Sequence, residues 1–280
     1  MTEPVSKRTS VMNHLRSPAI SRSPVGRLAR SRREVLGFLG GVAGTALFGC
    51  SRQPEGLPPV ASSGSAQADD LLDCIVRPQQ TAGPFFVDTQ LNRADLRADP
   101  ATGRISSGVP LGLSFQIFQV GNIQPEGPRM CMPLPNAVVD VWHCDAAGIY
   151  SGVRDRQSDT TGQAFLRGYQ VTDQDGVAEF MTIYPGWYPG RTVHIHFKIR
   201  TVSTSGAIAP IRYEFTSQLY FDDALTDRIY RQMPYTARGQ RAQRNHQDAI
   251  FQFGGAQLLL PVAQTDRGYF GRFGIGLEMG

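Results

Sequence analysis

The feature that most constrains the fold is a series of short runs rich in β-branched and aromatic residues, several with alternating polar residues. These runs are LGLSFQIFQV (111–120), AVVDVWH (137–143), VAEFMTI (177–183), TVHIHFKIR (192–200) and YEFTSQLYF (213–221). Pairs of Gly, Pro, Asn and Asp that favour turns separate them. Only residues 222–233 have a clear helical pattern, and a second short helix is expected near 68–73. The pattern predicts an all-β chain, a β-sandwich of mainly antiparallel strands with one or two short helices.

Charge is unevenly distributed along the chain. Residues 1–49 hold eight of the 28 Lys and Arg residues and two of the 24 Asp and Glu residues. The remainder therefore carries 20 basic and 22 acidic groups, a net charge of −2. A near-neutral body does not attract a phosphate backbone through its field, so we expect no nucleic-acid partner.

The N-terminus has the pattern of an export signal. The uncharged apolar stretch 35–49 is shorter than the roughly 20 residues that span a bilayer, and a basic segment precedes it. Residues 31–36 (SRREVL) resemble a twin-arginine export motif, and residues 47–50 (LFGC) resemble a lipoprotein box. We expect removal of 1–49, a lipid anchor on Cys50, and a location on the periplasmic or cell-surface side of the membrane. An ordinary secretory signal with an unmodified Cys50 is the alternative.

Two segments follow the signal. Residues 50–69 are rich in Pro, Ser, Gly and Ala and predict a flexible tether. Residues 70–280 are long enough for one domain with a sizeable core. Because the twin-arginine route carries folded proteins, often with a cofactor already inserted, this signal favours a metal in the domain.

Three cysteines remain after Cys50, namely Cys74, Cys131 and Cys144. An oxidising compartment permits a disulfide and leaves one thiol over. Cys131 and Cys144 lie at the two ends of one strand and its lead-in, so we predict a Cys131–Cys144 disulfide. Three buried, reduced cysteines are the alternative.

The sharpest local motif is His194-Ile195-His196. On a strand, residues i and i+2 point to the same face, so both imidazoles can reach one metal ion. Ile195, together with Val193 and Phe197, would then face the core. By itself the motif is equally compatible with two hydrogen-bonded surface histidines.

The loop upstream of this motif changes that balance. Residues 182–191 (TIYPGWYPGR) are rich in Pro and Gly and must turn sharply, which brings the loop tyrosines near the histidine strand. A phenol has a pKa near 10 and is a poor ligand for divalent ions at neutral pH. Ferric iron is a hard, trivalent Lewis acid that can displace the phenol proton, and imidazole also suits iron. Mixed Tyr and His ligation would therefore select ferric iron over zinc.

Several segments, taken in order, resemble the intradiol ring-cleavage dioxygenase family. They are residues 80–86 (QTAGPFF), 137–150 (AVVDVWHCDAAGIY), 165–168 (FLRG), 172–176 (TDQDG), 182–197 (TIYPGWYPGRTVHIHF) and 216–221 (TSQLYF). The resemblance spans roughly residues 77–222. The ordered set is far more specific than any one motif.

The resemblance implies a non-haem Fe(III) cofactor, one per chain, with the ligands Tyr150, Tyr188, His194 and His196. It implies a small aromatic diol of the catechol or protocatechuate type as substrate, with O2 as co-substrate. The ring would open between its two hydroxylated carbons to give a cis,cis-muconate-type diacid. Iron would stay ferric and act as a Lewis acid, so no external reductant is needed.

The resemblance also implies roles for residues around the metal. Tyr188 would be released to accept a catechol proton, Arg191 would stabilise the activated ring, and Gln218 would line the pocket. The substrate side would be formed by Thr81, Gly83 and Pro84, with Trp187 stacking on the ring. The plain structural alternatives are a surface arginine for Arg191 and a sheet-edge amide for Gln218. For Thr81, Gly83 and Pro84 the alternative is a structural turn, and for Trp187 it is simple packing.

Two features depart from the family pattern. Only five residues separate Tyr188 from His194, a shorter loop that would leave the pocket more open. Both halves of the site lie in one chain, which is compatible with either a homo-oligomer or a self-sufficient monomer.

Residues 222–280, including Asn245-His246-Gln247-Asp248, have no expected role. The rival functions are an exported binding module with an inactive site and a sandwich that binds zinc or copper.

Overall fold

The computed structural model describes residues 74–279 apart from 123–128, 157 and 203–210. The predicted signal (1–49), its lipidation site Cys50, the tether (50–69) and the short helix near 68–73 lie outside the described residues.

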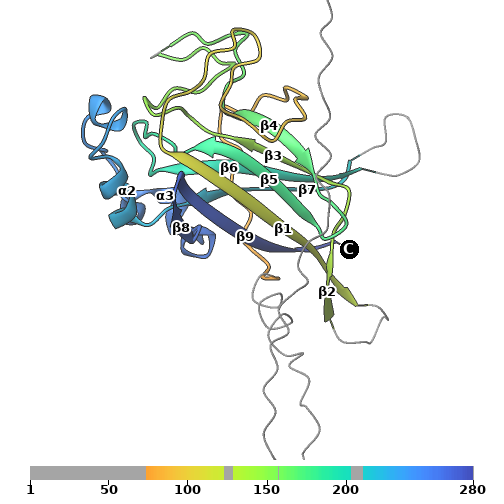
Figure 1. The fold of residues 1–280 in the computed structure, drawn as a ribbon. Helices are drawn as coiled ribbons and strands as arrows, with labels where there is room; N and C mark the ends of the chain where they lie inside the picture. Colours follow the sequence, from red (N-terminus) through yellow and green to blue (C-terminus); the bar gives the residue numbers. More distant parts are fainter. Residues whose placement is uncertain (1–73, 123–128, 157, 203–210, 280) are drawn as a thin grey trace, which may run out of the picture. The chain divides into compact units, whose positions relative to one another are not determined.

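The described chain forms two stacked β-sheets (Figure 1). The strands are β1 (Pro110–Asn122), β2 (Arg129–Pro133), β3 (Ala137–Trp142), β4 (Arg167–Val171), β5 (Val177–Ile183), β6 (His194–Val202), β7 (Ile211–Tyr220), β8 (Val262–Thr265) and β9 (Gly268–Glu278). The first sheet has the order β2-β1-β9-β8, with β5 also paired to β1, and the second has the order β4-β3-β6-β7. Every named pair is antiparallel except β1 with β9. The predicted all-β sandwich is confirmed.

Short helices gather at one end of the sheets (Figure 1). They are α2 (Asp223–Ile229) and α3 (Ala249–Gln252), with 3-10 turns η1 (Tyr235–Arg238), η2 (Asn245–Gln247) and η3 (Gly255–Leu258). The predicted cap of α2 is present, because the Asp222 carboxylate accepts from the Leu225 N–H at 2.8 Å. The helix is shorter than expected, since Pro234 disfavours helical geometry in the residues before it.

The core lies between the inner faces of the two sheets. Ile195, Phe197 and Ile199 of β6 point inward and are fully buried. Phe115 of β1 meets Phe197 with ring centroids 5.3 Å apart. Because strand side chains alternate, His194 and His196 lie on the opposite, outer face of the second sheet.

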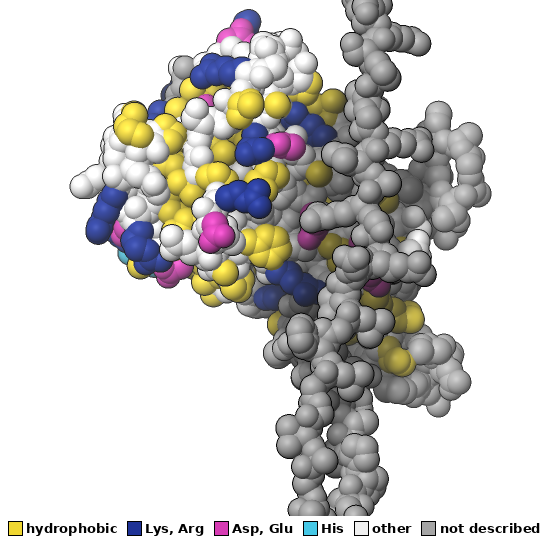
Figure 2. Space-filling view, viewed as in Figure 1, with side chains coloured by type: hydrophobic (Ala, Val, Ile, Leu, Met, Phe, Trp, Pro, Cys, Tyr) yellow, Lys and Arg dark blue, Asp and Glu magenta, His cyan; other side chains and the backbone are white. Residues whose placement is uncertain are grey.

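The described surface mixes charges of both signs. Figure 2 shows Lys and Arg side chains on one face separated by Asp, Glu and apolar side chains. Exposed ion pairs occur among the described residues, for example between Arg97 and Asp95 at 2.7 Å. Within the described ranges, no helix is long and apolar enough to cross a bilayer.

The disulfide prediction is wrong in one partner. Cys131 is bonded to Cys74, and Cys144 is a free, buried thiol. Cys131 lies on β2 in the first sheet, whereas Cys144 follows β3 in the second, so their closeness in sequence does not bring them together. Cys144 instead packs in a cluster with Trp142 and Tyr150.

Removing the Cys74–Cys131 disulfide should destabilise the domain. The bond closes a loop with a sequence separation of 57, and loop-closure entropy predicts a loss of about 4 kcal/mol in the free energy of unfolding. Urea unfolding of Cys131→Ala measures the loss, with Cys144→Ala as the matched control that leaves the bond intact. A Cys131–Cys144 peptide in a non-reducing digest would contradict this assignment.

His143 connects the two sheets at the end of β3. Its Nδ1 lies 2.8 Å from the Cys144 carbonyl oxygen, and its Nε2 lies 2.7 Å from the Thr182 hydroxyl on β5. The carbonyl requires a proton on Nδ1, so Nε2 accepts from the hydroxyl and the ring is neutral. Burial lowers the pKa of His143 to about 4.

His143 should make stability depend on pH. The unfolded chain binds its proton near pH 6.5 and the folded chain only near pH 4, so this stability is present above pH 6.5 and is lost as pH falls. Between pH 7.5 and 5 the loss from this group is about 2 kcal/mol. Urea unfolding of metal-free protein at both pH values should show a drop that is smaller by this amount in His143→Gln. The exposed His246→Gln serves as control, and equal drops in wild type and His143→Gln would contradict the assignment.

Candidate metal centre

Two histidines converge on the outer face of the second sheet. His194 and His196 are both buried, and their Nε2 atoms lie 3.1 Å apart. Neighbouring strands hold them in register, with Trp142 of β3 and Gln218 of β7 beside His196. The Trp142 ring lies parallel to the His196 ring at 5.0 Å, which fixes the plane of that imidazole.

Two tyrosines complete the group. The Tyr150 hydroxyl lies 3.4 Å from His194 Nε2. The Tyr188 ring meets both Tyr150 and His194 with centroids 5.6 Å apart in each case. The structure therefore brings together all four residues predicted as metal ligands, Tyr150, Tyr188, His194 and His196.

The loops that carry the tyrosines are in direct backbone contact. A side chain at Gly148 would meet the Trp187 carbonyl oxygen at 2.1 Å, and one at Gly186 would meet the Asp145 carbonyl oxygen at 2.4 Å. Gly148 also has a φ of +80°, which glycine adopts without strain. The Asp145 carboxylate orders its own loop by accepting from two backbone N–H groups. Each tyrosine thus depends on close approach of the other loop.

Burial keeps the histidines neutral and the phenols protonated in the absence of a metal. It lowers the pKa of His194 to about 3 and that of His196 well below its usual range. It raises the pKa of Tyr188 to about 12 and that of Tyr150 well above its usual range. Neutral imidazoles offer lone pairs without prior loss of a proton.

The donor atoms fit a single cation. His194 Nδ1 lies 2.6 Å from the Thr192 carbonyl oxygen, so it carries the proton and Nε2 presents a lone pair toward His196. His196 Nδ1 is buried without a hydrogen-bond partner, and the Nε2 atom of the same ring faces His194 Nε2. Two nitrogens 3.1 Å apart can both bind the same metal ion, each at a distance of about 2.1 Å. Among the described residues no group of three His, Cys, Asp or Glu side chains suited to a metal occurs, and the further oxygen donors beside the two histidines are those of Tyr150 and Tyr188.

Arg191 lies beside the histidines and is held by several partners. Its Nη1 is 3.4 Å from His194 Nε2, and its Nη2 donates to Gln218 Oε1 at 2.6 Å. Gln218 in turn donates to the Thr81 carbonyl oxygen at 2.9 Å. The predicted residues Arg191, Gln218 and Thr81 therefore form one chain of contacts that borders the metal centre.

The segment that follows Thr81 covers the site. Gly83 lies against His196, where an added Cβ would be 3.3 Å from Cε1. Phe85 stacks on Tyr150 at 4.5 Å and meets Tyr188 edge-on at 5.7 Å. These contacts form a wall over the site. The wall presents an apolar side chain, Phe85, to the tyrosines, and directly over His196 it consists of the Gly83 backbone alone.

Two predicted substrate residues are less well supported by the geometry. Pro84 is exposed. The Arg238 guanidinium carbon lies 5.1 Å from the centroid of the Trp187 ring. The Trp187 indole N–H donates to the Gly239 carbonyl oxygen at 3.4 Å. Trp187 packs against the main core rather than the cluster that contains Tyr150 and Tyr188.

Sequence reasoning missed Phe85, Trp142 and Asp248 as site residues. Phe85 and Trp142 lie inside segments that had been singled out, so strand alternation around Trp142 could have placed it beside His196. Asp248 gave no signal, because its partner Arg191 is 57 residues away in sequence.

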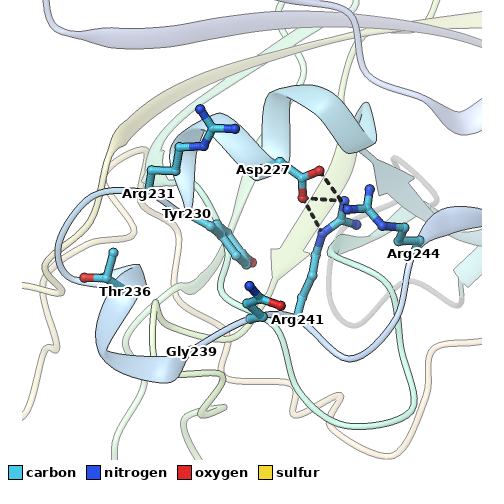
Figure 3. A pocket seen from close by; sticks show the side chains of 8 residues that line it. Asp227, Tyr230, Arg231, Thr236, Gly239, Arg241 and Arg244 are labelled. Atoms are coloured by element: carbon cyan, nitrogen blue, oxygen red, sulfur yellow. Dashed lines mark hydrogen bonds and ion pairs between the residues drawn. The ribbon is translucent and has the colours of Figure 1, made fainter.

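A cavity beside the short helices is a different feature. A cavity of about 460 Å³ is lined by Asp227, Tyr230, Arg231, Thr236, Gly239, Gln240, Arg241 and Arg244 (Figure 3). Asp227 is paired with Arg241 and Arg244, each at 2.9 Å. None of the four candidate ligands lines it, so we do not assign it to the reaction.

The fold and site define a class of β-sandwich protein with a buried centre of two histidines and two tyrosines on a sheet face. The family model described as "Dioxygenase" matches residues 82–240 of this chain. The chain belongs to this family, the intradiol ring-cleavage dioxygenases.

Individual relatives agree with this membership. The chain is 34% identical over 109 residues to a protocatechuate 3,4-dioxygenase beta chain of Burkholderia cepacia, a match covering 36% of this chain and 44% of that relative. It is 30% identical over 107 residues to a chlorocatechol 1,2-dioxygenase of Pseudomonas putida, covering 32% and 36% respectively. The matched part thus spans less than half of either relative. An intradiol ring-cleavage dioxygenase of Tetranychus urticae superposes with a TM-score of 0.58 at 26% identity, covering 74% of this chain and 95% of that one.

Replacing Gly83 by alanine should disturb His196. The new methyl group would press on Cε1 at 3.3 Å, and the φ of +66° would cost about 1–2 kcal/mol of folding free energy. We expect weaker binding of ferric iron, by roughly 10-fold, in chelator competition.

Gly103→Ala is the matched control for this variant. Gly103 has a similar φ of +71°, but nothing lies within 4 Å of its added Cβ. It should lose similar stability in urea unfolding and bind iron as the wild type does. Equal iron affinity in the two variants would show that Gly83 does not support His196.

Proposed function

We propose that this chain is a non-haem Fe(III) intradiol dioxygenase, which uses O2 to open the ring of a catechol-type diol between its two hydroxylated carbons. The product would be a cis,cis-muconate-type diacid. The observation that carries the proposal is the convergence of Tyr150, Tyr188, His194 and His196 at one buried point beside Arg191. Membership of the family supports it.

The same four residues would hold the iron. Bound ferric iron would supply a Lewis acid that activates the diol ring toward O2. Phenolate oxygens favour a trivalent ion over zinc, and the two buried imidazoles are neutral and ready to bind.

Tyr188 is the residue that would take up a substrate proton. In the absence of a metal, burial raises the pKa of its phenol to about 12, so the Tyr188 oxygen, once released from the metal, would readily accept a proton from a diol hydroxyl. Tyr188 also lies at the boundary of the cluster, where it contacts Phe85 and is less deeply enclosed than Tyr150.

Arg191 would stabilise negative charge that develops on the deprotonated ring. Its side chain is 13% exposed, and a fixed cation acts more strongly in such a water-poor place. Gln218 holds one branch of the guanidinium, and Phe85 helps to exclude water above the tyrosines. The substrate would enter beside these groups and lie against the backbone of Gly83.

We also propose that the protein acts outside the cytoplasm, anchored through Cys50. The twin-arginine and lipoprotein motifs support export. The Cys74–Cys131 disulfide supports an oxidising compartment. Labelling with radioactive palmitate, compared between wild type and Cys50→Ala, would test the anchor.

Purified protein loaded with ferric iron should be coloured by tyrosinate-to-iron charge transfer. Adding catechol under nitrogen should shift the visible band, and admitting air should bleach the complex with uptake of one O2 per ring. Tyr150→Phe should lose part of the colour, because it removes one of the two phenolates. Tyr188→Phe should keep part of the colour and lose most ring cleavage.

Tyr269→Phe on β9 in the first sheet provides the control, with unchanged colour and activity. A protein that stays colourless with ferric iron, or that binds zinc or copper instead, would overturn the proposal. A coloured protein that binds catechol without consuming O2 would support the rival binding module.

A further inference from the structure

A buried carboxylate from the C-terminal region contacts Arg191, which borders the candidate metal centre. Asp248 lies between η2 and α3, and its side chain is 1% exposed. One oxygen, Oδ2, accepts from Arg191 Nε at 2.8 Å and from the Thr192 N–H at 2.7 Å. The other oxygen, Oδ1, accepts from the Ile250 and Phe251 N–H groups and caps α3.

The surrounding segment is fastened to the same point. Asn245 accepts from the Thr192 hydroxyl at 2.7 Å and donates to the Phe221 carbonyl oxygen at 2.8 Å. Just before it, Arg241 and Arg244 are paired with Asp227 of α2, as Figure 3 shows. The segment from α2 to α3 therefore places two polar side chains, those of Asn245 and Asp248, against Thr192. Thr192 lies two residues before His194.

The carboxylate determines how Arg191 is turned. Arg191 Nε is bonded to Asp248, and Nη2 is bonded to Gln218 on the neighbouring strand β7. With these two positions held, Nη1 is directed toward His194 at 3.4 Å. A guanidinium is planar, so two fixed nitrogens fix the third.

We propose that Asp248 is a positioning residue that aims Arg191 at the substrate bound beside His194. The inference rests on the proposed function and extends it to a residue outside the matched family region, which ends at residue 240. Asp248 acts through Arg191 and does not itself touch the metal ligands. Its negative charge also balances the arginine, which allows a cation to stay buried near an iron centre.

The test compares Asp248→Asn with Asp222→Asn in the iron-loaded full chain. Both substitutions remove the charge from a helix-capping carboxylate, and Asn caps a helix about as well as Asp. Asp222 has no contact with Arg191, so its variant should keep kcat/KM for catechol within twofold. Asp248→Asn should lose about 10- to 100-fold, mainly in kcat, with the colour of the ferric protein retained.

A second measurement separates positioning from general structural support. In an Arg191→Met background, Asp248→Asn should change the Kd of catechol, titrated by the visible band under nitrogen, by less than twofold. In the wild-type background it should weaken that Kd by several-fold, because the two residues act as one unit. Equal effects in both backgrounds would overturn the proposal.

Arg191→Lys keeps the inference testable if Asp248→Asn does not fold. Lysine keeps the charge but cannot bond Asp248 and Gln218 at once in the same fixed geometry. We expect a loss of kcat/KM similar to that of Asp248→Asn, and wild-type activity would overturn the proposal. Failure of the proposed function would be distinct, since the wild type itself would then be colourless or inactive.

Discussion

The site depends on the alternation of side chains along β6. Ile195, Phe197 and Ile199 are buried in the sandwich core, so the residues between them must face the other way. The hydrophobic effect thereby fixes His194 and His196 on one face and at one spacing, because a slip by one residue would place imidazoles in the core. Every other group at the centre is arranged around these two rings.

Strand patterns predicted much of the fold and the site. Alternation along β3, β5, β6 and β7 indicated a sandwich, and the resemblance to the intradiol dioxygenases, carried by the His-x-His motif and the tyrosine-bearing segments, implied the four candidate ligands. These signals are local or follow chain order, so a sequence can show them. The contact between Gly148 and the Trp187 carbonyl explains why two separate loops present their tyrosines to the same point.

Other parts of the structure depend on pairings that sequence distance does not reveal. The disulfide joins Cys74 to Cys131 because the segment before Gly83 passes the β2 end of the first sheet, whereas Cys144 belongs to the second sheet. The same limitation hid Asp248, whose bond to Arg191 forms only when the segment between η2 and α3 packs against residues 191–192, just before β6. Turn-rich segments with short helices carry little periodicity, so their placement is decided by tertiary contacts.

Gly83 leaves bare main chain against the ring of His196. A wall of bare main chain offers the same peptide surface whatever the neighbouring sequence, and no larger residue can occupy it without meeting His196. Under the proposed function, differences in the rings that bind would arise at flanking side chains such as Phe85 and Val153, which pack in the same cluster. Among homologues, differences in ring preference should be sought at those positions, with position 83 behaving as a fixed reference point.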